Sequence, residues 1–300
     1  HYTMPSDSVI AAPLSWDKEY TDPSFRCSAY DNVHVPWGSN HESTWDIVKH
    51  TPYCCGQFIW TGWDYIGEPT PYGFPARSSY FGIIDLAGFP KDSYYMYQSE
   101  WTDKPVLHLF PHWNWLEGQD IDMWCYYNDY DDVELFVNGK SQGVQRKKDS
   151  HQFHVAWRVK YEPGEVKVVA HRDGKAVAEQ TIRTAGAPDH IRLTADRSAM
   201  TADGKSLAFV TVEVLDKDGN LCPHADDQIF FDVSGNGAIA GVDNGLQTSM
   251  ERFKDNKRKA FNGKCLVVLR AGKTPGKLHI KAKSYNLKSS ELTFDIAAVR

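Results

Sequence analysis

Residues 133–139 read VELFVNG, a run typical of a β-strand that ends in the dipeptide Asn138-Gly139. Asn-Gly is the favoured pair for the two-residue turn of a β-hairpin, because both turn residues take positive φ values. A second hairpin is predicted where Asp173-Gly174 separates the strand-like residues 165–171 from residues 176–183. The two hairpins predict an antiparallel β-sheet in the middle of the chain.

Two further strand-like runs, at residues 121–127 and 153–161, accompany these hairpins. Residues 105–186 therefore contain about six short strands and no convincing helix. This pattern predicts a small antiparallel sandwich of immunoglobulin-like type. Residues 186–188, GAP, are interpreted as a linker after it.

The last part of the chain, residues 187–300, also predicts a β-sandwich. Its clearest strand is residues 208–215, where the side chains alternate strongly. Further strands are predicted at residues 190–194, 228–233, 265–270, 278–284 and 290–296. The basic run at residues 254–259 also contains Asp255, and it is interpreted as a solvated loop rather than a binding patch.

The first part, residues 1–104, has a different composition. All ten tryptophans lie between Trp16 and Trp157, most prolines lie at or before Pro111, and acidic residues outnumber basic ones in this part. Its sequence combines predicted helices with a short apolar run, unlike the strand-rich remainder. It is therefore predicted to be one portion of an α/β fold, because one or two βα units cannot bury both faces of a parallel sheet.

Three elements are predicted in this first part. A helix at residues 42–49 ends before Pro52, since proline bars the preceding residue from the helical region. Residues 57–60, QFIW, form the kind of short apolar run that a buried parallel strand shows. Asp92 is predicted to cap a second helix, in which aromatic side chains recur up to Trp101 at spacings of three and four.

Composition excludes several classes of function. The 300-residue chain has a mass of 34.0 kDa, a mean hydropathy of -0.51 and a formal net charge of -6. We expect no membrane-spanning segment, because no run approaches the roughly 18 apolar residues that a membrane helix needs. We expect no nucleic-acid partner, since surplus positive charge is lacking.

Metal and cofactor signals are weak. The six cysteines are too few for a disulfide scaffold, and no Cys or His pair has the spacing of a zinc site. Asp129, Asp131 and Asp132 lack the glycine and glutamate of a calcium-binding EF-hand, so they are interpreted as an acidic turn. No cofactor and no metal site are expected.

Residues 60–69, WTGWDYIGEP, directly follow the predicted strand and are the candidate site. In an α/β barrel the active site is built at the carboxyl ends of the strands. The indole rings of Trp60 and Trp63 suit the apolar face of a sugar, while the carboxylates of Asp64 and Glu68 suit its hydroxyl groups. From spacing alone, the two acids are interpreted as solvated or structural rather than as the carboxylate pair of a glycosidase, because proline- and glycine-rich loops place acids unpredictably.

Residues 56–101 closely resemble the last strand, loop and helix of the catalytic barrel in glycoside hydrolase family 2, particularly in β-galactosidases of Bacteroidetes. Residues 193–219, with the glycine-rich residues 235–237 and 241–245, are similar to the C-terminal sandwich of that family. The resemblance implies a multidomain, mainly β chain. It would hold the C-terminal end of a (β/α)8 TIM barrel in residues 1–104, followed by immunoglobulin-like β-sandwich domains in residues 105–186 and 187–300.

The resemblance also implies a function. The parent protein would be a retaining glycoside hydrolase acting on terminal β-D-galactosides, with both catalytic glutamates expected upstream of residue 1, so that the isolated chain is inactive. Residues 1–5 look like the stretch after the nucleophile strand, and neither Glu19 nor Glu42 has a nucleophile-like context. Trp60 carries over as a substrate contact. Asp64, Trp63 and Glu68 are weaker transfers, since the acids could instead hold the loop.

Alternatives remain open at this point. The sandwiches could form a non-catalytic carbohydrate-binding or scaffold module, or the parent could be a β-glucuronidase of the same family. The loop after Trp60 offers only Arg77 before Lys91 as a cation for a uronate, which favours a neutral sugar. The expected partners are a carbohydrate substrate and the remainder of the barrel or a second copy of the chain. A periplasmic or secreted location is expected.

Overall fold

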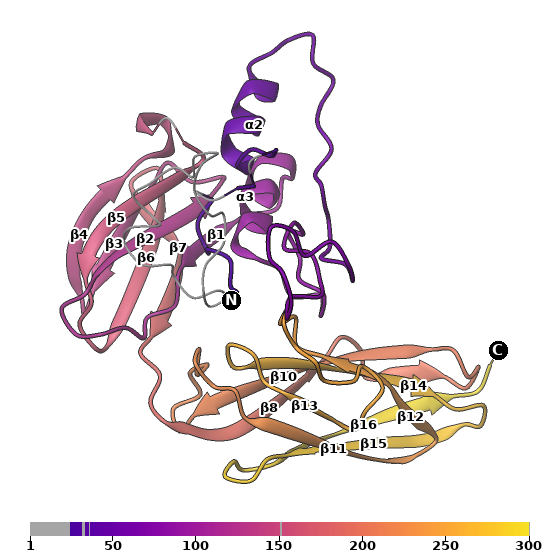
Figure 1. Ribbon diagram of the computed structural model, residues 1–300. Coiled ribbons are helices and arrows are strands. Elements are labelled where there is room, and N and C mark those ends of the chain that lie inside the picture. The colour runs from indigo at the N-terminus through magenta and orange to yellow at the C-terminus, as the bar shows by residue number, and fades with distance from the viewer. Residues whose placement is uncertain (1–24, 32–33, 36, 151, 300) are drawn as a thin grey trace. The chain divides into compact units, whose positions relative to one another are not determined.

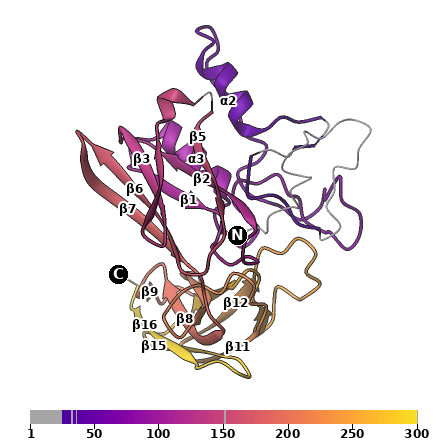
Figure 2. The ribbon, with the colours of Figure 1, turned by 90° about the vertical axis from the view of Figure 1, so that its left-hand side faces the viewer.

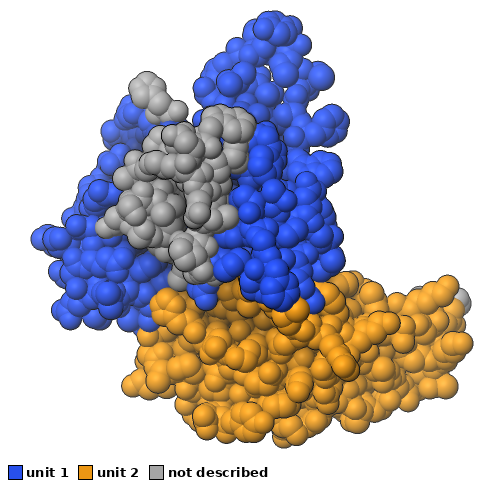
Figure 3. Space-filling model, in the orientation of Figure 1, with its two compact units in different colours: residues 1–184 blue, residues 185–300 orange. Residues whose placement is uncertain are grey.

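A computed structural model describes residues 25–31, 34–35, 37–150 and 152–299. The chain divides into two compact units, residues 1–184 and residues 185–300, which Figure 3 colours separately. The described part is mainly β, as the sequence predicts. The division into three domains at residues 104 and 186 stays a prediction, and residues 1–5 and Glu19 lie outside the described residues.

Two helices, α2 (His41–Lys49) and α3 (Asp92–Trp101), lie in the first unit (Figure 1). The side chain of Asn40 caps α2 by accepting a hydrogen bond from the Ser43 amide at 3.1 Å. The predicted helix at residues 42–49 is confirmed. The predicted cap of α3 is wrong: Asp92 is its first helical residue, and its carboxylate binds the Nε2 atom of His108 at 2.8 Å instead.

The residues between the helices, 50–91, contain turns and bridges but no named strand. Backbone bridges join Trp63 to Ile84 and Ile66 to Ser78. The prediction of a strand at residues 57–60 is wrong for this structure, because no neighbouring strand among the described residues pairs with this run. The expected end of a TIM barrel is therefore represented by two helices and a loop, and the described residues form no barrel.

The first sandwich consists of two antiparallel sheets, with orders β1-β2-β5 and β4-β3-β6-β7 (Figures 1 and 2). Its strands are β1 Leu107–Phe110, β2 Asp120–Tyr127, β3 Asp132–Val137, β4 Lys140–Gln145, β5 His154–Lys160, β6 Glu165–Arg172 and β7 Lys175–Arg183. Both predicted hairpins are confirmed. Their turn residues all have positive φ, 48° and 78° at Asn138-Gly139 and 52° and 71° at Asp173-Gly174.

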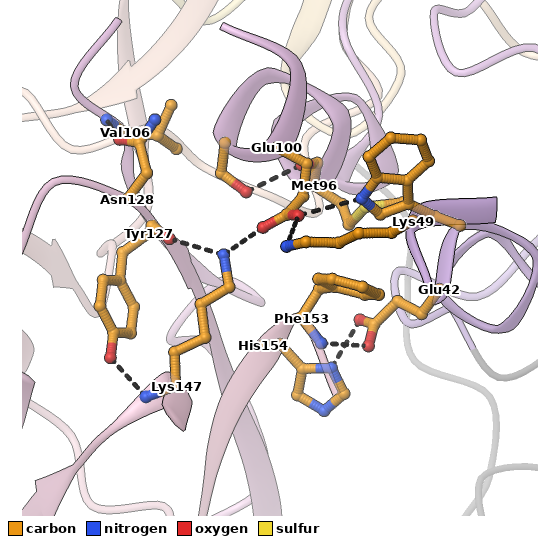
Figure 4. Close-up of polar contacts among 12 residues, drawn as sticks. Glu42, Lys49, Met96, Glu100, Val106, Tyr127, Asn128, Lys147, Phe153 and His154 are labelled. Carbon is orange, nitrogen blue, oxygen red and sulfur yellow. Dashed lines mark hydrogen bonds and ion pairs between the residues drawn. The ribbon is translucent and has the colours of Figure 1, made fainter. Parts of the chain in front are cut away.

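Helix α3 packs on β2 of this sandwich, and two buried carboxylates fix the helices in place (Figure 4). Lys49 and Lys147 both point toward the carboxylate of Glu100, which also accepts a 3.0 Å hydrogen bond from the Trp45 indole. Lys147 belongs to the short 3-10 helix η1 (Lys147–Asp149). The carboxylate of Glu42 on α2 accepts bonds from Phe153 and His154 at the start of β5, at 2.8 and 2.6 Å. Hydrogen bonds and ion pairs therefore connect both helices to the first sandwich.

The second unit is a separate β-sandwich with sheet orders β12-β14-β10-β8 and β13-β11-β15-β16-β9. Its strands are β8 Pro188–Ala195, β9 Ala199–Thr201, β10 Leu207–Asp216, β11 Gln228–Gly235, β12 Gly237–Asp243, β13 Lys257–Lys259, β14 Lys264–Ala271, β15 Gly276–Lys283 and β16 Ser290–Ala297. The six predicted strands are present, whereas β9, β12 and β13 were not predicted. Alternate residues of both sheets fill a continuous apolar core, as the period of two requires.

The interpretation of residues 254–259 as a solvated loop is wrong at Arg258. This side chain is only 1% exposed, and its Nη2 atom donates to Asp243 at 2.7 Å and to Asn244 at 3.0 Å. It lies on β13, whose flanking residues Lys257 and Lys259 are exposed. A charge in the middle of a three-residue strand points inward because the strand period is two, and it is tolerated there because it is paired.

Candidate functional site

The candidate site is the exposed turn that runs from Trp60 to Glu68. The Trp60 side chain is 72% exposed, and its indole Nε1–H donates to the Tyr65 hydroxyl at 3.2 Å. The two rings meet edge to face with their centroids 6.2 Å apart. The Tyr65 hydroxyl in turn donates to the Glu68 carboxylate, and it is thereby acceptor and donor at once. Trp60, Tyr65 and Glu68 form a connected group at the surface, called the Trp60 triad below.

Trp63 lies beside this group without entering it. Its side chain is also mostly exposed, at 58%, and its backbone pairs with Ile84. The bridge holds the main chain, and most of the side chain stays exposed. The role of Trp63 as a sugar contact stays a prediction.

Asp64 has a different environment from Glu68. Its side chain is fully buried, with Oδ2 at 2.7 Å from the Lys91 ammonium and Oδ1 accepting the Gly82 amide at 2.8 Å. Lys91 also donates to the carbonyl of Tyr80 at 3.0 Å. These contacts tie the start of the loop to its end and favour the loop-holding role of Asp64 over contact with a sugar.

Gly82 is required by this close packing. A Cβ atom added at Gly82 would lie 2.1 Å from the backbone nitrogen of Asp64, so no other residue fits without moving the backbone. The buried pair of Asp64 and Lys91 is therefore built on a glycine contact that the sequence pattern does not reveal. It forms a rigid base under the exposed aromatic groups.

Tyr65 is the functional candidate that sequence reasoning missed. It is partly buried, and burial followed by its hydrogen bond to Glu68 raises the pKa of its phenol above the ordinary value of 10.0. It therefore stays protonated at neutral pH and available as a donor. The only signal for Tyr65 in the sequence is the Trp-x₄-Tyr-x₂-Glu spacing of residues 60–68. Outside a helix this spacing does not determine which side chains meet, so it does not predict the contacts.

The expected absence of metal sites and membrane spans stays an expectation. Over the ranges that the structure describes, no three His, Cys, Asp or Glu side chains are grouped so as to hold a metal ion. In the acidic turn, Asp129 is paired with Arg172, and Asp132 with His171. No helix within the described ranges is long and apolar enough to cross a membrane.

Two family models match the chain. Residues 191–293 match glycoside hydrolase family 2 C-terminal domain 5, and residues 118–178 match a domain of unknown function. The first match covers the second unit from β8 to β16. The second covers the middle of the first sandwich, from β2 to β7.

Individual relatives extend the similarity over nearly the whole chain. It is 65% identical over 292 residues to beta-galactosidase BoGH2A of Bacteroides ovatus, which covers 97% of this chain and 34% of that protein. It is 34% identical over 251 residues to a putative beta-glucuronidase of Formosa agariphila, covering 81% of this chain and 24% of that protein. A crystal structure of a beta-glycosidase from Bacteroides vulgatus superposes on 91% of this chain and 34% of its own, with a TM-score of 0.84 and 34% identity.

The chain spans about a third of the length of the curated relative from Bacteroides ovatus and less of the relative from Formosa agariphila. The similarity to the first of these extends well beyond residues 191–293, over the candidate site and the first sandwich. Family model, sequence identity and fold agree with one another. The chain therefore belongs to glycoside hydrolase family 2, to the C-terminal region of that family's proteins.

Proposed function

We propose that the whole protein containing this chain is a retaining β-galactosidase and that this chain supplies part of its sugar-binding surface through Trp60. The observation that carries the proposal is the exposed Trp60 indole, held by a neighbouring tyrosine beside a carboxylate. An aromatic face next to hydrogen-bond acceptors is suited to the apolar face and the hydroxyl groups of a pyranose. The 65% identity to a protein named beta-galactosidase supports the choice of sugar.

The chain's own part in the reaction would be binding and orientation. Retaining hydrolysis uses two carboxyl groups about 5–5.5 Å apart, one as nucleophile and one as acid/base. Among the acids already considered, Glu42 is engaged with His154 and Asp64 with Lys91, so neither is available as a nucleophile. Both catalytic glutamates are proposed to lie upstream of this chain, as the family resemblance implies, and the isolated chain is predicted to be inactive.

The partner of the exposed apolar side chains is proposed to be the remainder of the barrel. Tyr53, Phe58 and Phe74 are almost fully exposed in the segment between α2 and α3. Large apolar side chains left in solvent gain free energy when a partner covers them. The relatives contain about two thirds of their length beyond the matched region, which is enough chain to cover it. A second copy of the chain is the other candidate partner, and we propose a periplasmic or secreted location.

A β-glucuronidase is the second candidate, because relatives with that name also match. Such an enzyme needs cationic groups for the substrate carboxylate. From residue 60 to residue 91 the only basic residues are Arg77 and Lys91, and the ammonium of Lys91 is buried against Asp64. The loop therefore favours a neutral sugar.

The test compares two chromogenic substrates with the whole protein. We expect turnover of nitrophenyl β-galactoside to exceed turnover of nitrophenyl β-glucuronide, and Trp60→Ala to lower kcat/KM by at least about tenfold, which corresponds to about 1.4 kcal/mol. Tyr285→Ala is the control, because it removes an aromatic ring that is equally exposed but lies in the second unit. Preference for the glucuronide would support the second candidate, and full activity of Trp60→Ala would contradict the assigned role of Trp60.

The non-catalytic alternative is tested with the 300-residue chain itself. Binding of the chain to a glycan array, undiminished by Trp60→Ala, would support a carbohydrate-binding module in the sandwiches. Loss of binding with that variant would instead locate recognition in the loop. Absence of binding agrees with a chain that only completes a larger site.

A further inference from the structure

Tyr65 lies at the centre of the Trp60 triad. Its hydroxyl oxygen accepts the indole N–H of Trp60 at 3.2 Å, and its hydroxyl proton is donated to Oε2 of Glu68. Trp60 and Glu68 are exposed, and no other hydrogen bond of their side chains is found among the described residues. The Tyr65 hydroxyl is thus the group through which the orientations of both side chains are linked.

The backbone of Tyr65 forms hydrogen bonds through both its amide and its carbonyl group. Its amide donates to the hydroxyl of Ser79 at 3.1 Å, and its carbonyl accepts the amide of Ser79 at 2.8 Å. Ser79 is completely buried. The preceding residue, Asp64, is held by the ion pair with Lys91. The backbone of Tyr65 is therefore held by buried neighbours, while the exposed side chains of Trp60 and Glu68 both contact its hydroxyl.

We propose that Tyr65 is a positioning residue, whose hydroxyl sets the orientation of the Trp60 indole and of the Glu68 carboxylate before a sugar binds. This inference rests on the proposed function of Trp60. Side chains that are already oriented lose less conformational freedom on binding, and this strengthens binding without a new contact. The arrangement also assigns separate roles to atoms. The indole N–H is occupied by Tyr65, so Trp60 offers the sugar its ring face, and Oε1 of Glu68 is left to accept a sugar hydroxyl.

The first test measures the geometry in the 300-residue chain. The indole N–H resonance of Trp60, identified by its loss in Trp60→Phe, is followed by nuclear magnetic resonance in Tyr65→Phe. We expect this resonance to shift while the other indole resonances stay in place, because only the Trp60 N–H loses its acceptor. Tyr285→Phe is the matched control and leaves all indole resonances unchanged. An unchanged Trp60 resonance in Tyr65→Phe overturns the proposal.

The second test measures the consequence in the whole protein with nitrophenyl β-galactoside. We expect Tyr65→Phe to raise KM about five- to tenfold, the effect of one net hydrogen bond, with kcat changed less than about twofold. A merely structural role would lower thermal stability and kcat instead. Glu68→Ala should raise KM further, because it removes the acceptor Oε1 as well as the link to Tyr65, and the effects of the two substitutions should be less than additive, because both remove the Tyr65–Glu68 hydrogen bond.

The outcomes separate this inference from the proposed function. If Trp60→Ala impairs the enzyme and Tyr65→Phe does not, the positioning role is overturned and the sugar-binding role of Trp60 stands. If Trp60→Ala has no effect, the proposed function fails, whatever Tyr65→Phe shows. If the effects of Tyr65→Phe and Glu68→Ala add fully, the two residues act independently and the positioning role is likewise overturned.

Discussion

The segment between α2 and α3 and the sandwich of the second unit use similar apolar residues in opposite ways. Phe58 is fully exposed in the segment, whereas Phe231 and Phe294 are buried in the sandwich. In the second unit every core strand has a paired neighbour within the same unit, so alternate side chains are enclosed between two sheets. Residues 50–91 have only isolated backbone bridges. In these two regions, the apolar residues are buried where their strands are paired and exposed around Phe58, where no strand forms.

The largest effect is expected from a pair of phenylalanine substitutions that tests this comparison directly. Phe231→Ala should lower the free energy of unfolding of the second unit by about 3–5 kcal/mol, because it leaves a cavity in a closed core. Phe58→Ala should change stability by less than about 0.5 kcal/mol, because the side chain contacts solvent. Urea denaturation, followed by hydrogen-exchange mass spectrometry, measures the change in the free energy of unfolding separately for each unit. Equal effects of the two substitutions would contradict the comparison.

A second pair of variants tests the buried charge in the sandwich. Arg258→Ala should destabilise the second unit by about 3 kcal/mol, because Asp243 loses its buried counter-charge. Lys254→Ala, in the same basic run but exposed, should change stability by less than about 0.5 kcal/mol. Thermal denaturation of the two variants is the measurement. A mild effect of Arg258→Ala would mean that water reaches Asp243 once the guanidinium is removed.

The corresponding buried charge in the first unit is Glu100. Burial opposes its ionisation, but hydrogen bonds from Lys147 and Lys49 outweigh burial and lower its pKa below 4.5. The stabilisation is thus present above pH 4.5 and is lost as pH falls through the lower pKa of the folded state. Glu100→Gln should cost about 2 kcal/mol at pH 7, the value for a hydrogen bond to a charged group, and less at pH 3. Glu117→Gln, at an exposed glutamate, is the control, and a cost independent of pH would refute the assigned charge interaction.

An effect no larger than that of Glu100 is expected at Asp216, at the end of β10. Burial would raise its pKa, but hydrogen bonds from Asn220, Gly186 and Asp218 lower it to about 2. Its stabilisation is complete above pH 3.8 and is lost as pH falls toward 2. Asp216→Asn should cost about 2 kcal/mol at pH 7, and its difference from the unsubstituted chain should close between pH 4 and pH 2. Melting curves across this range measure it, with the exposed Asp218→Asn as control; a gap that widens on acidification would reverse the assigned sign.

The sandwiches were largely predictable because their signals are local. Asn138-Gly139 and Asp173-Gly174 determine turn geometry by themselves, and strand alternation marks the buried face. The strands missed lack such signals. β12 begins and nearly ends in glycine, and β13 consists of three basic residues, of which Arg258 is buried only through its partners on other strands. Both strands, β12 and β13, form by pairing with strands that are distant in the sequence, which a local pattern does not predict.

The candidate site was predictable in composition but not in geometry. Trp60 and Glu68 lie at the surface as a binding role requires, whereas Asp64, four residues before Glu68, is buried. The difference depends on Lys91, which lies 27 residues further along the chain, so spacing within the loop carries no information about it. The role of Tyr65 could not be predicted for a related reason. Its hydroxyl contacts Trp60 and Glu68 across the turn, and the sequence pattern does not specify the geometry of that turn.

The pairing of β9 with β16 determines when the second unit can fold. Met200, near the start of the unit, pairs in parallel with Ile296, close to its end. The chain loses the conformational entropy of closing this long loop before the distant contacts stabilise it, so a fold of this kind is expected to form slowly. During synthesis, the five-stranded sheet cannot be completed until the last strand has left the ribosome. Removing β16 would therefore break two pairings at once, with β15 and with β9, and leave the five-stranded sheet incomplete.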